Sequence, residues 1–203
     1  MQYIDAAMVG SLGGSASAAI GLVSTTTWLF GGLCVAASTG FAVQGAHLIG
    51  AEKDGEAQNV LRQGLLVSLL FGLLLGIIGI FLSGKLPLWL HGEPAICPDA
   101  SRYFFIYACA LPAIQLRQAA GGMLQCSGDM RTPSLLNIVM CFLDVVLNSL
   151  LIFPTRTASF LGLRLVLPGA GLGVAGAALG TALSEGITAS LMLYALCFRS
   201  PRL

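Results

Sequence analysis

The sequence has few charged residues for its size. Only 9% of its 203 residues are Asp, Glu, Lys or Arg, whereas a soluble domain carries roughly 25%. Its mean hydropathy is correspondingly high, at +0.87. With so little charge, most of the outer surface cannot face water, so the sequence predicts a protein that faces lipid. The formal net charge of +1 also provides no basic surface for binding nucleic acid.

Motifs of the common enzyme classes are missing as well. There are two histidines, His47 and His91, and neither belongs to a zinc-protease HExxH or lies near a serine-hydrolase GxSxG. Six cysteines are present, but none has the CxxC spacing of zinc and redox sites, and five lie in or beside apolar runs. The sequence therefore predicts that the protein is not an enzyme and has no resident metal or cofactor.

The first residues have no basic leader of the kind that begins a signal peptide, and Asp5 stands where a basic residue would be expected. We therefore expect the chain to begin partway along a helix. No charged residue occurs between Asp5 and Glu52, and none occurs in residues 63–84. At a 1.5 Å rise per residue, the second run covers roughly 33 Å, enough to cross a bilayer core.

Polar loops rich in glycine and proline divide the remaining apolar sequence. The fold predicted is all-α: a polytopic transmembrane bundle with about five full spans after the end of a first helix, forming one lobe over residues 1–203. The predicted helical segments are 1–11 (partial), 16–48, 63–84, 101–126, 133–153 and 170–198. Gly72/Gly76 and Gly176/Gly180 have the four-residue spacing that lets membrane helices approach closely.

Ionisable side chains inside membrane spans are rare and mark functional sites by default. Asp144 lies midway along the 133–153 segment, and helical periodicity places it on one stripe with Asn137 and Asn148. The stripe should face the bundle interior or a water-filled cavity. A carboxylate there could bind and release a proton or a cation, as a coupled carrier requires. The alternative is a structural polar network between helices; we favour the transport role.

Two further charges lie in predicted spans. Glu185 shares a face with Thr181 and Thr188, and it is either a second proton or cation site or a carboxylate paired with Arg117 or with neighbouring hydroxyls. Arg117 lies beside Gln118 in the 101–126 segment, and is expected to be a structural counter-charge or to reach toward an interface. Arg117, Gln118 and Thr181 are predicted to line a polar cavity together with the asparagines of the Asp144 stripe.

Four stretches, in this order, resemble the multidrug and toxic compound extrusion (MATE) family of transporters. They are IDAAMVGSLGGSASAAIGL, AVQGAHLIGAEKDGEA, LRQAAGGMLQCSGDMRTPSLLNI and PGAGLGVAGAALGTALSE. The resemblance implies an integral protein of the bacterial plasma membrane, with two six-helix lobes around a central cavity. It also implies export of cationic or amphipathic drugs and toxins in exchange for H⁺ or Na⁺.

The resemblance assigns residues too. Asp5 matches the acidic position near the end of the family's first helix, which in many members contributes to the cation site. The fifth helix of some members carries an asparagine and then an aspartate four residues on; here the order is reversed, with Asp144 before Asn148. The length accounts for one lobe of a twelve-helix transporter, the N-terminal one. The second lobe is expected in the same parent chain or as a second copy.

Two other functions fit parts of the sequence. A lipid-linked oligosaccharide flippase shares the broad architecture, but such carriers line their cavity with several basic residues, and here only Arg117 is clearly intramembrane. A non-transporting membrane subunit, or the remnant of a truncated transporter gene, would account for the length. It would not account for the intramembrane acidic residues.

Overall fold

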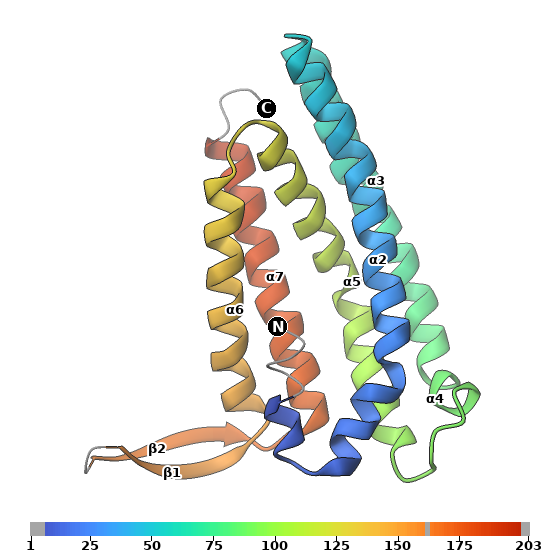
Figure 1. The fold of residues 1–203 in the computed structure, drawn as a ribbon, viewed down its shortest axis with the longest axis vertical. Helices are drawn as coiled ribbons and strands as arrows, with labels where there is room; N and C mark the ends of the chain where they lie inside the picture. Colours follow the sequence, from blue (N-terminus) through green and yellow to red (C-terminus); the bar gives the residue numbers. More distant parts are fainter. Residues whose placement is uncertain (1–6, 161–162, 200–203) are drawn as a thin grey trace.

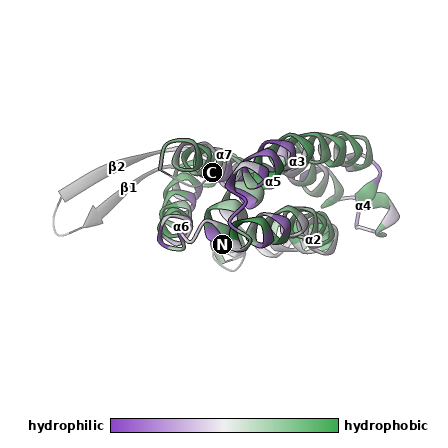
Figure 2. Cartoon of the chain, turned by 90° about the horizontal axis from the view of Figure 1, so that it is seen from above, coloured by the Kyte–Doolittle hydropathy of each residue, from purple (hydrophilic) through white to green (hydrophobic). Residues whose placement is uncertain are grey.

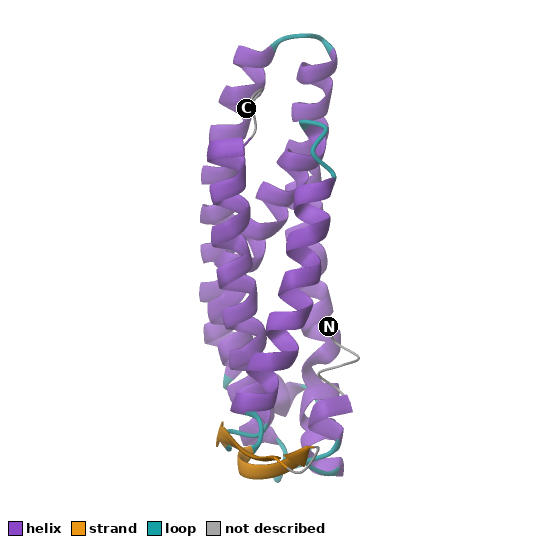
Figure 3. Ribbon diagram, turned by 90° about the vertical axis from the view of Figure 1, so that its left-hand side faces the viewer, coloured by secondary structure: helices purple, strands orange, loops and turns teal. Residues whose placement is uncertain are grey.

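A computed structural model describes residues 7–160 and 163–199 of the chain. A helical turn at residues 7–10 precedes the main elements. These are α2 (Gly14–Gly50), α3 (Asp54–Ser83), α4 (Leu86–Trp89), α5 (Cys97–Cys126), α6 (Arg131–Leu151), β1 (Pro154–Phe160), β2 (Leu163–Ala170) and α7 (Val174–Arg199). The long helices run along one bundle axis, with the β-hairpin projecting from one end (Figure 1). The turn between α2 and α3 lies at the opposite end (Figure 3).

Each long helix occupies one of the predicted segments, and the differences are at the helix ends. The largest is at α3, which begins at Asp54 rather than at residue 63. Asp54 and Glu56 lie in its first turn, where negative charge favours the positive end of the helix dipole. Lys53 adds an exposed ion pair to Glu56 at 3.0 Å. The charged segment therefore extends the helix beyond its apolar part.

The β-hairpin is an element that the all-helical prediction lacked. Its antiparallel strands pair from Pro154–Ala170 to Phe160–Leu163, with an irregularity between Pro154 and Arg156. The strand pairing supplies hydrogen bonds to backbone N–H and C=O groups that are not part of a helix. The hairpin also delays the start of α7 to Val174, because Gly171 and Gly173 take positive φ angles of 64° and 56° in the connecting turn.

Among the described residues, four helices are long and apolar enough to cross a membrane: α2, α3, α6 and α7. α5 has 30 residues but is not one of the four. It packs against α2, α3 and α7, and Figure 2 shows it in the middle of the arrangement. A helix enclosed by protein can carry polar residues such as Gln115 and Arg117, which lower its hydropathy. We infer that α5 is the central helix of the lobe.

Small residues bring α3 and α5 together. A Cβ atom added at Gly76 would lie 2.9 Å from the Ala108 carbonyl oxygen, and one added at Gly79 would lie 2.8 Å from the Ala108 Cβ. Gly72 is equally close to the backbone of Pro112. Such backbone contact supplies the van der Waals attraction that holds helices together where no water drives them to associate. The Gly72/Gly76 spacing in the sequence therefore marks a real helix interface.

The outer surface is apolar. Large hydrophobic side chains stand outward on α2, α3 and α6, among them Trp28, Phe81, Ile138 and Phe142, with 65%, 79%, 67% and 71% of their surface exposed. In Figure 2 the helices are coloured mostly as hydrophobic. Exposure of this extent would be costly in water and suits contact with lipid.

Candidate functional site

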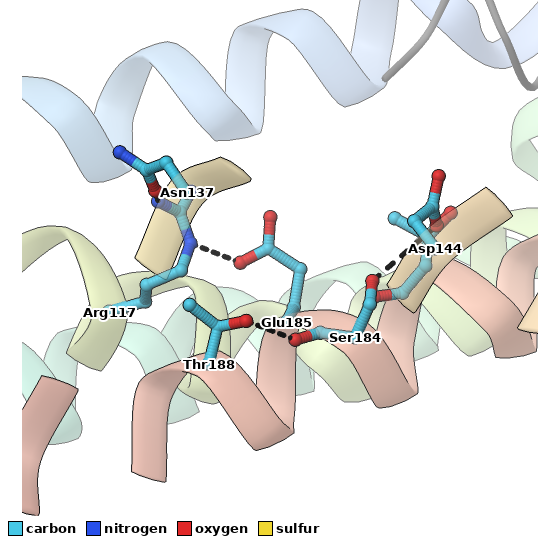
Figure 4. Close-up of polar contacts among 7 residues, drawn as sticks. Arg117, Asn137, Asp144, Ser184, Glu185 and Thr188 are labelled. Atoms are coloured by element: carbon cyan, nitrogen blue, oxygen red, sulfur yellow. Dashed lines mark hydrogen bonds and ion pairs between the residues drawn. The ribbon is translucent and has the colours of Figure 1, made fainter. Parts of the chain in front are cut away.

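Asp144 is fully buried on α6, and so is Asn148 one turn further along. The Ser184 hydroxyl of α7 donates a long hydrogen bond to Asp144 Oδ1, at 3.4 Å. Asp144 Oδ2 has no hydrogen-bond partner among the residues that the structure describes. Figure 4 shows Ser184 directed toward this carboxyl group. Asp144 is thus enclosed, and one of its two oxygens lacks a hydrogen-bond partner among the described residues.

Asn148 is seated by a glycine of α7. A Cβ atom added at Gly180 would lie 2.1 Å from Asn148 Oδ1 and 3.1 Å from its Cγ. Only glycine, which has no Cβ atom, leaves room for the Asn148 side chain at this position. One turn earlier, a Cβ atom added at Gly176 would lie 2.5 Å from the Leu151 carbonyl oxygen. The Gly176/Gly180 pair therefore lets α7 pack directly over the buried polar stripe of α6.

This contact gives a stability prediction. Gly180→Ala should destabilise the protein by about 1–3 kcal/mol, the usual cost of overpacking, because Asn148 must move. Gly186→Ala is the matched control, since Gly186 is in the same helix and nothing lies within 4 Å of an added Cβ. Thermal unfolding of the two purified variants in the same detergent compares them. Equal melting temperatures for the two would contradict the close α6–α7 contact.

Glu185 and Arg117 form an ion pair between α7 and α5. Arg117 Nε donates to Glu185 Oε2, and the exposed fractions of the two side chains are 12% and 9%. Arg117 Nη1 also donates to Asn137 Oδ1 on α6, at 3.3 Å (Figure 4). Of the partners that the sequence offers Glu185, the structure shows Arg117; the prediction that Glu185 takes part in coupling is separate from this pairing. The structure also places Arg117 as a counter-charge within the bundle and not at an interface.

The hydroxyls near Glu185 are engaged with their own helix. Thr188 donates to the Ser184 carbonyl at 2.7 Å, and Thr181 donates to the Ala177 carbonyl at 3.1 Å. Such bonds are common for serine and threonine in apolar helices. The same hydroxyl oxygens can still accept hydrogen bonds, but their protons are not available to the Glu185 carboxylate in this arrangement.

A cavity of about 220 Å³ opens beside the ion pair. It lies between α2, α5, α6 and α7 and is lined by Val35, Ser38, Thr39, Ala42, Arg117, Gln118, Gly121, Gly122, Gln125, Pro133, Asn137 and Met192. Three of the predicted cavity residues, Arg117, Gln118 and Asn137, are among them. Thr181 instead borders a separate space of about 10 Å³ with Glu185 and two tyrosines, Tyr103 and Tyr107. Neither space includes Asp144 or Asn148 in its lining.

The predicted site is therefore divided into two neighbouring parts. One is the Asp144 seam between α6 and α7, and the other is the Arg117–Glu185 pair with the cavity. The adjacent positions Ser184 and Glu185 on α7 join them, as Figure 4 shows. Asp5, the remaining predicted coupling residue, lies outside the described residues. The sequence did not single out Ser38 or Ser184, because uncharged serines are common in membrane helices and carry no distinguishing signal.

Comparison with known proteins identifies the family. A model of the MatE family matches residues 1–150. The chain is 23% identical over 192 residues to the probable multidrug resistance protein NorM of Thermotoga maritima, covering 95% of this chain and 39% of the relative. It is 23% identical over 149 residues to the FAD transporter of Shewanella oneidensis, covering 73% of this chain and 33% of the relative. The chain thus spans well under half the length of either.

Solved structures agree on the fold. A crystal structure of a mutant MATE matches with a TM-score of 0.86 at 24% identity, over 98% of this chain and 42% of that chain. Inward-facing and outward-facing structures of a multidrug resistance MATE transporter match with TM-scores of 0.81 and 0.82, each over 98% of this chain and 41% of that chain. The helical fold of this chain is therefore shared with matched structures in both conformations.

These matches agree with the apolar helices that can cross a membrane. They confirm the family resemblance and the polytopic helical fold that the sequence predicts. Members of this family are transporters and not enzymes. The chain belongs to the MatE family of transporters and is an integral membrane protein with a polytopic helical fold.

Proposed function

We propose that this lobe is the N-terminal part of a secondary antiporter, which exports cationic or amphipathic drugs and toxins in exchange for H⁺ or Na⁺. The observation that carries the proposal is Asp144, a fully buried carboxyl group in a helix that can span the membrane, with one oxygen unpartnered among the described residues. Burying a charged carboxylate in a membrane span is costly unless a proton, a cation or another partner neutralises it. Binding and releasing a cation or a proton is the use that a coupled carrier makes of it.

The proposal includes a second lobe and a bacterial plasma membrane. The chain covers 39% of the NorM relative and 42% of the matched MATE crystal structure. A second lobe would supply the opposite wall of the cavity, either from the same parent chain or from a second copy. Blotting source membranes with an antibody to residues 52–62 measures the size of the native protein. A band well above 21.0 kDa would support a second lobe in the same chain.

The flippase alternative has less support. Of the described residues that line the 220 Å³ cavity, Arg117 alone is charged, and its guanidinium is already paired with Glu185. A cavity for polyanionic lipid-linked sugars would need more unpaired positive charge than this.

Reconstitution tests the proposal directly. Proteoliposomes holding the native-size protein should move a cationic dye when a pH or Na⁺ gradient is imposed, and should stop when the gradient is collapsed with an ionophore. Protein-free liposomes prepared in parallel give the leak rate. Dye movement at the leak rate under both gradients would overturn the antiport proposal, and movement that is unaffected by the ionophore would show a channel or carrier without coupling.

A further inference from the structure

The cavity beside Arg117 has a distinctive chemistry. Its lining carries three amide side chains, Gln118, Gln125 and Asn137, and two hydroxyls, Ser38 and Thr39. Among the described residues of this lining, Arg117 is the one charged group and none is a carboxylate. The described walls therefore present hydrogen-bonding groups and a single positive charge. Such a surface complements an acidic group and disfavours a positively charged one.

Arg117 lines this cavity and has more donors than the structure shows in use. A guanidinium carries five N–H groups in a rigid fork. Among the described residues, its Nε bonds to Glu185 and its Nη1 bonds to Asn137, the latter at 3.3 Å. The second bond is long for an N–H···O contact and should be displaced easily. Three N–H groups have no partner among the described residues, which is enough for the two parallel hydrogen bonds that a carboxylate or phosphate accepts.

Glu185 approaches Arg117 from outside the cavity. It borders the separate 10 Å³ space with Tyr103 and Tyr107, and does not line the 220 Å³ cavity. The guanidinium is thus between a fixed internal carboxylate and an open space of suitable polarity. An acidic ligand entering that space would compete with Glu185 for the same cation. In the absence of such a ligand, the ion pair with Glu185 neutralises the charge of Arg117.

The size of the cavity limits what it can hold. Pockets for drug-sized ligands measure roughly 300–1,000 Å³, and this one measures about 220 Å³. It accommodates an acidic head group on a small ring or short chain, while a larger remainder would lie outside it. The side chain of Thr39, which is exposed at the cavity wall, marks a side that protein does not cover.

We propose that Arg117 binds the acidic group, a carboxylate or phosphate, of an amphipathic ligand in this cavity, and that Glu185 is the intramolecular competitor for it. The statement that this ligand is transported cargo rests on the antiport function proposed above and concerns its amphipathic substrates, not its cationic ones, whereas the binding itself does not rest on that function. An acidic lipid head group would present the same chemistry as a soluble acid, so the two sources must be separated by experiment.

Benzoate and benzylammonium are suitable probes, because they share one ring and differ in the sign of their charge. Saturation-transfer difference NMR gives their dissociation constants for the protein in phosphatidylcholine nanodiscs, with no ion gradient. Benzoate should bind, and benzylammonium should bind at least about tenfold more weakly. The loss of one charge-assisted hydrogen bond accounts for a factor of that size. Adding phosphatidylglycerol to the nanodiscs separates the two sources. If the site takes a soluble acid, benzoate binding should stay unchanged. If it takes an acidic lipid head group, the lipid should displace benzoate.

Two variants distinguish binding from a structural role. Glu185→Gln removes the competitor and should tighten benzoate binding several-fold. The double variant Arg117→Gln/Glu185→Gln keeps a hydrogen-bonding pair of similar shape without buried charge, so it should fold, and it should weaken benzoate at least about tenfold. Arg131→Gln, at an exposed position at the start of α6, is the matched control and should change nothing.

Three results would overturn the proposal: no benzoate binding, equal binding of the two probes, or weaker benzoate binding in Glu185→Gln. A purely structural ion pair predicts the last of these, because breaking it would loosen the cavity. The outcome is independent of the antiport test. Benzoate can bind to a protein that exchanges no ions, and a working antiporter can fail to bind benzoate.

Discussion

Asp144→Asn is expected to abolish gradient-driven export while leaving the folded protein in the membrane. Asparagine has almost the shape of aspartate, so the packing of α6 against α7 should be kept. It cannot become negatively charged and cannot bind a proton at neutral pH. The Ser184 hydroxyl, 3.4 Å from Asp144 Oδ1, can still donate to the amide oxygen of the new side chain. The loss should therefore be confined to ion coupling.

The measurement is dye export from proteoliposomes under an imposed pH or Na⁺ gradient, at equal protein content. Asp54→Asn is the matched control, because Asp54 is exposed in the first turn of α3, where its charge serves only the helix end. It should transport like the unaltered protein. Full gradient-driven export by Asp144→Asn would exclude Asp144 as the coupling group and leave it a structural role between α6 and α7.

The position of Asp144 could be predicted because the signal is local. A helix returns to the same face after four and seven residues, so the sequence alone places Asn137, Asp144 and Asn148 on one stripe. The structure confirms that this stripe turns inward: Asp144 and Asn148 are fully buried against α7. The glycine spacing in α7 is likewise local, and it correctly indicated the close approach.

The partners of the stripe could not be predicted, because they depend on tertiary packing. Arg117 and Glu185 are 68 positions apart, and nothing in either helix alone selects one for the other. Pairing was therefore one alternative among several. The same limit applies to Ser38, which enters the cavity lining from α2 and accepts a hydrogen bond from Gln115 at 3.1 Å. Uncharged residues become recognisable as site residues only once their neighbours are known.

The hairpin at Pro154–Ala170 was missed for a different reason. The apolar and polar composition that separates lipid-facing from water-facing segments does not distinguish a loop from two short paired strands. Strand pairing depends on cross-strand neighbours and register, which are set when the segment folds back on itself. Composition sufficed for the helices because lipid imposes length and hydropathy on each of them separately.

Removing one partner of the Arg117–Glu185 pair should have unequal effects on stability. Arg117→Gln leaves the Glu185 carboxylate enclosed without its cation, and should cost about 3–5 kcal/mol of the free energy of unfolding. Glu185→Gln leaves a guanidinium that borders a polar cavity and keeps its bond to Asn137, so its cost should be smaller. The double variant should lie within about 1 kcal/mol of the unaltered protein, since no charge is then left unpaired.

Unfolding in mixed micelles of increasing dodecyl sulfate content gives the four free energies of this double-mutant cycle. The sum of the two single effects should clearly exceed the effect of the double variant, because the partners touch. Additive effects would show that the pair is not formed in the folded protein. Equal costs for the two single variants would show that the cavity does not stabilise Arg117. The asymmetry matters for function, because Arg117 can exchange Glu185 for an acidic ligand only if its charge is tolerated while the pair is open.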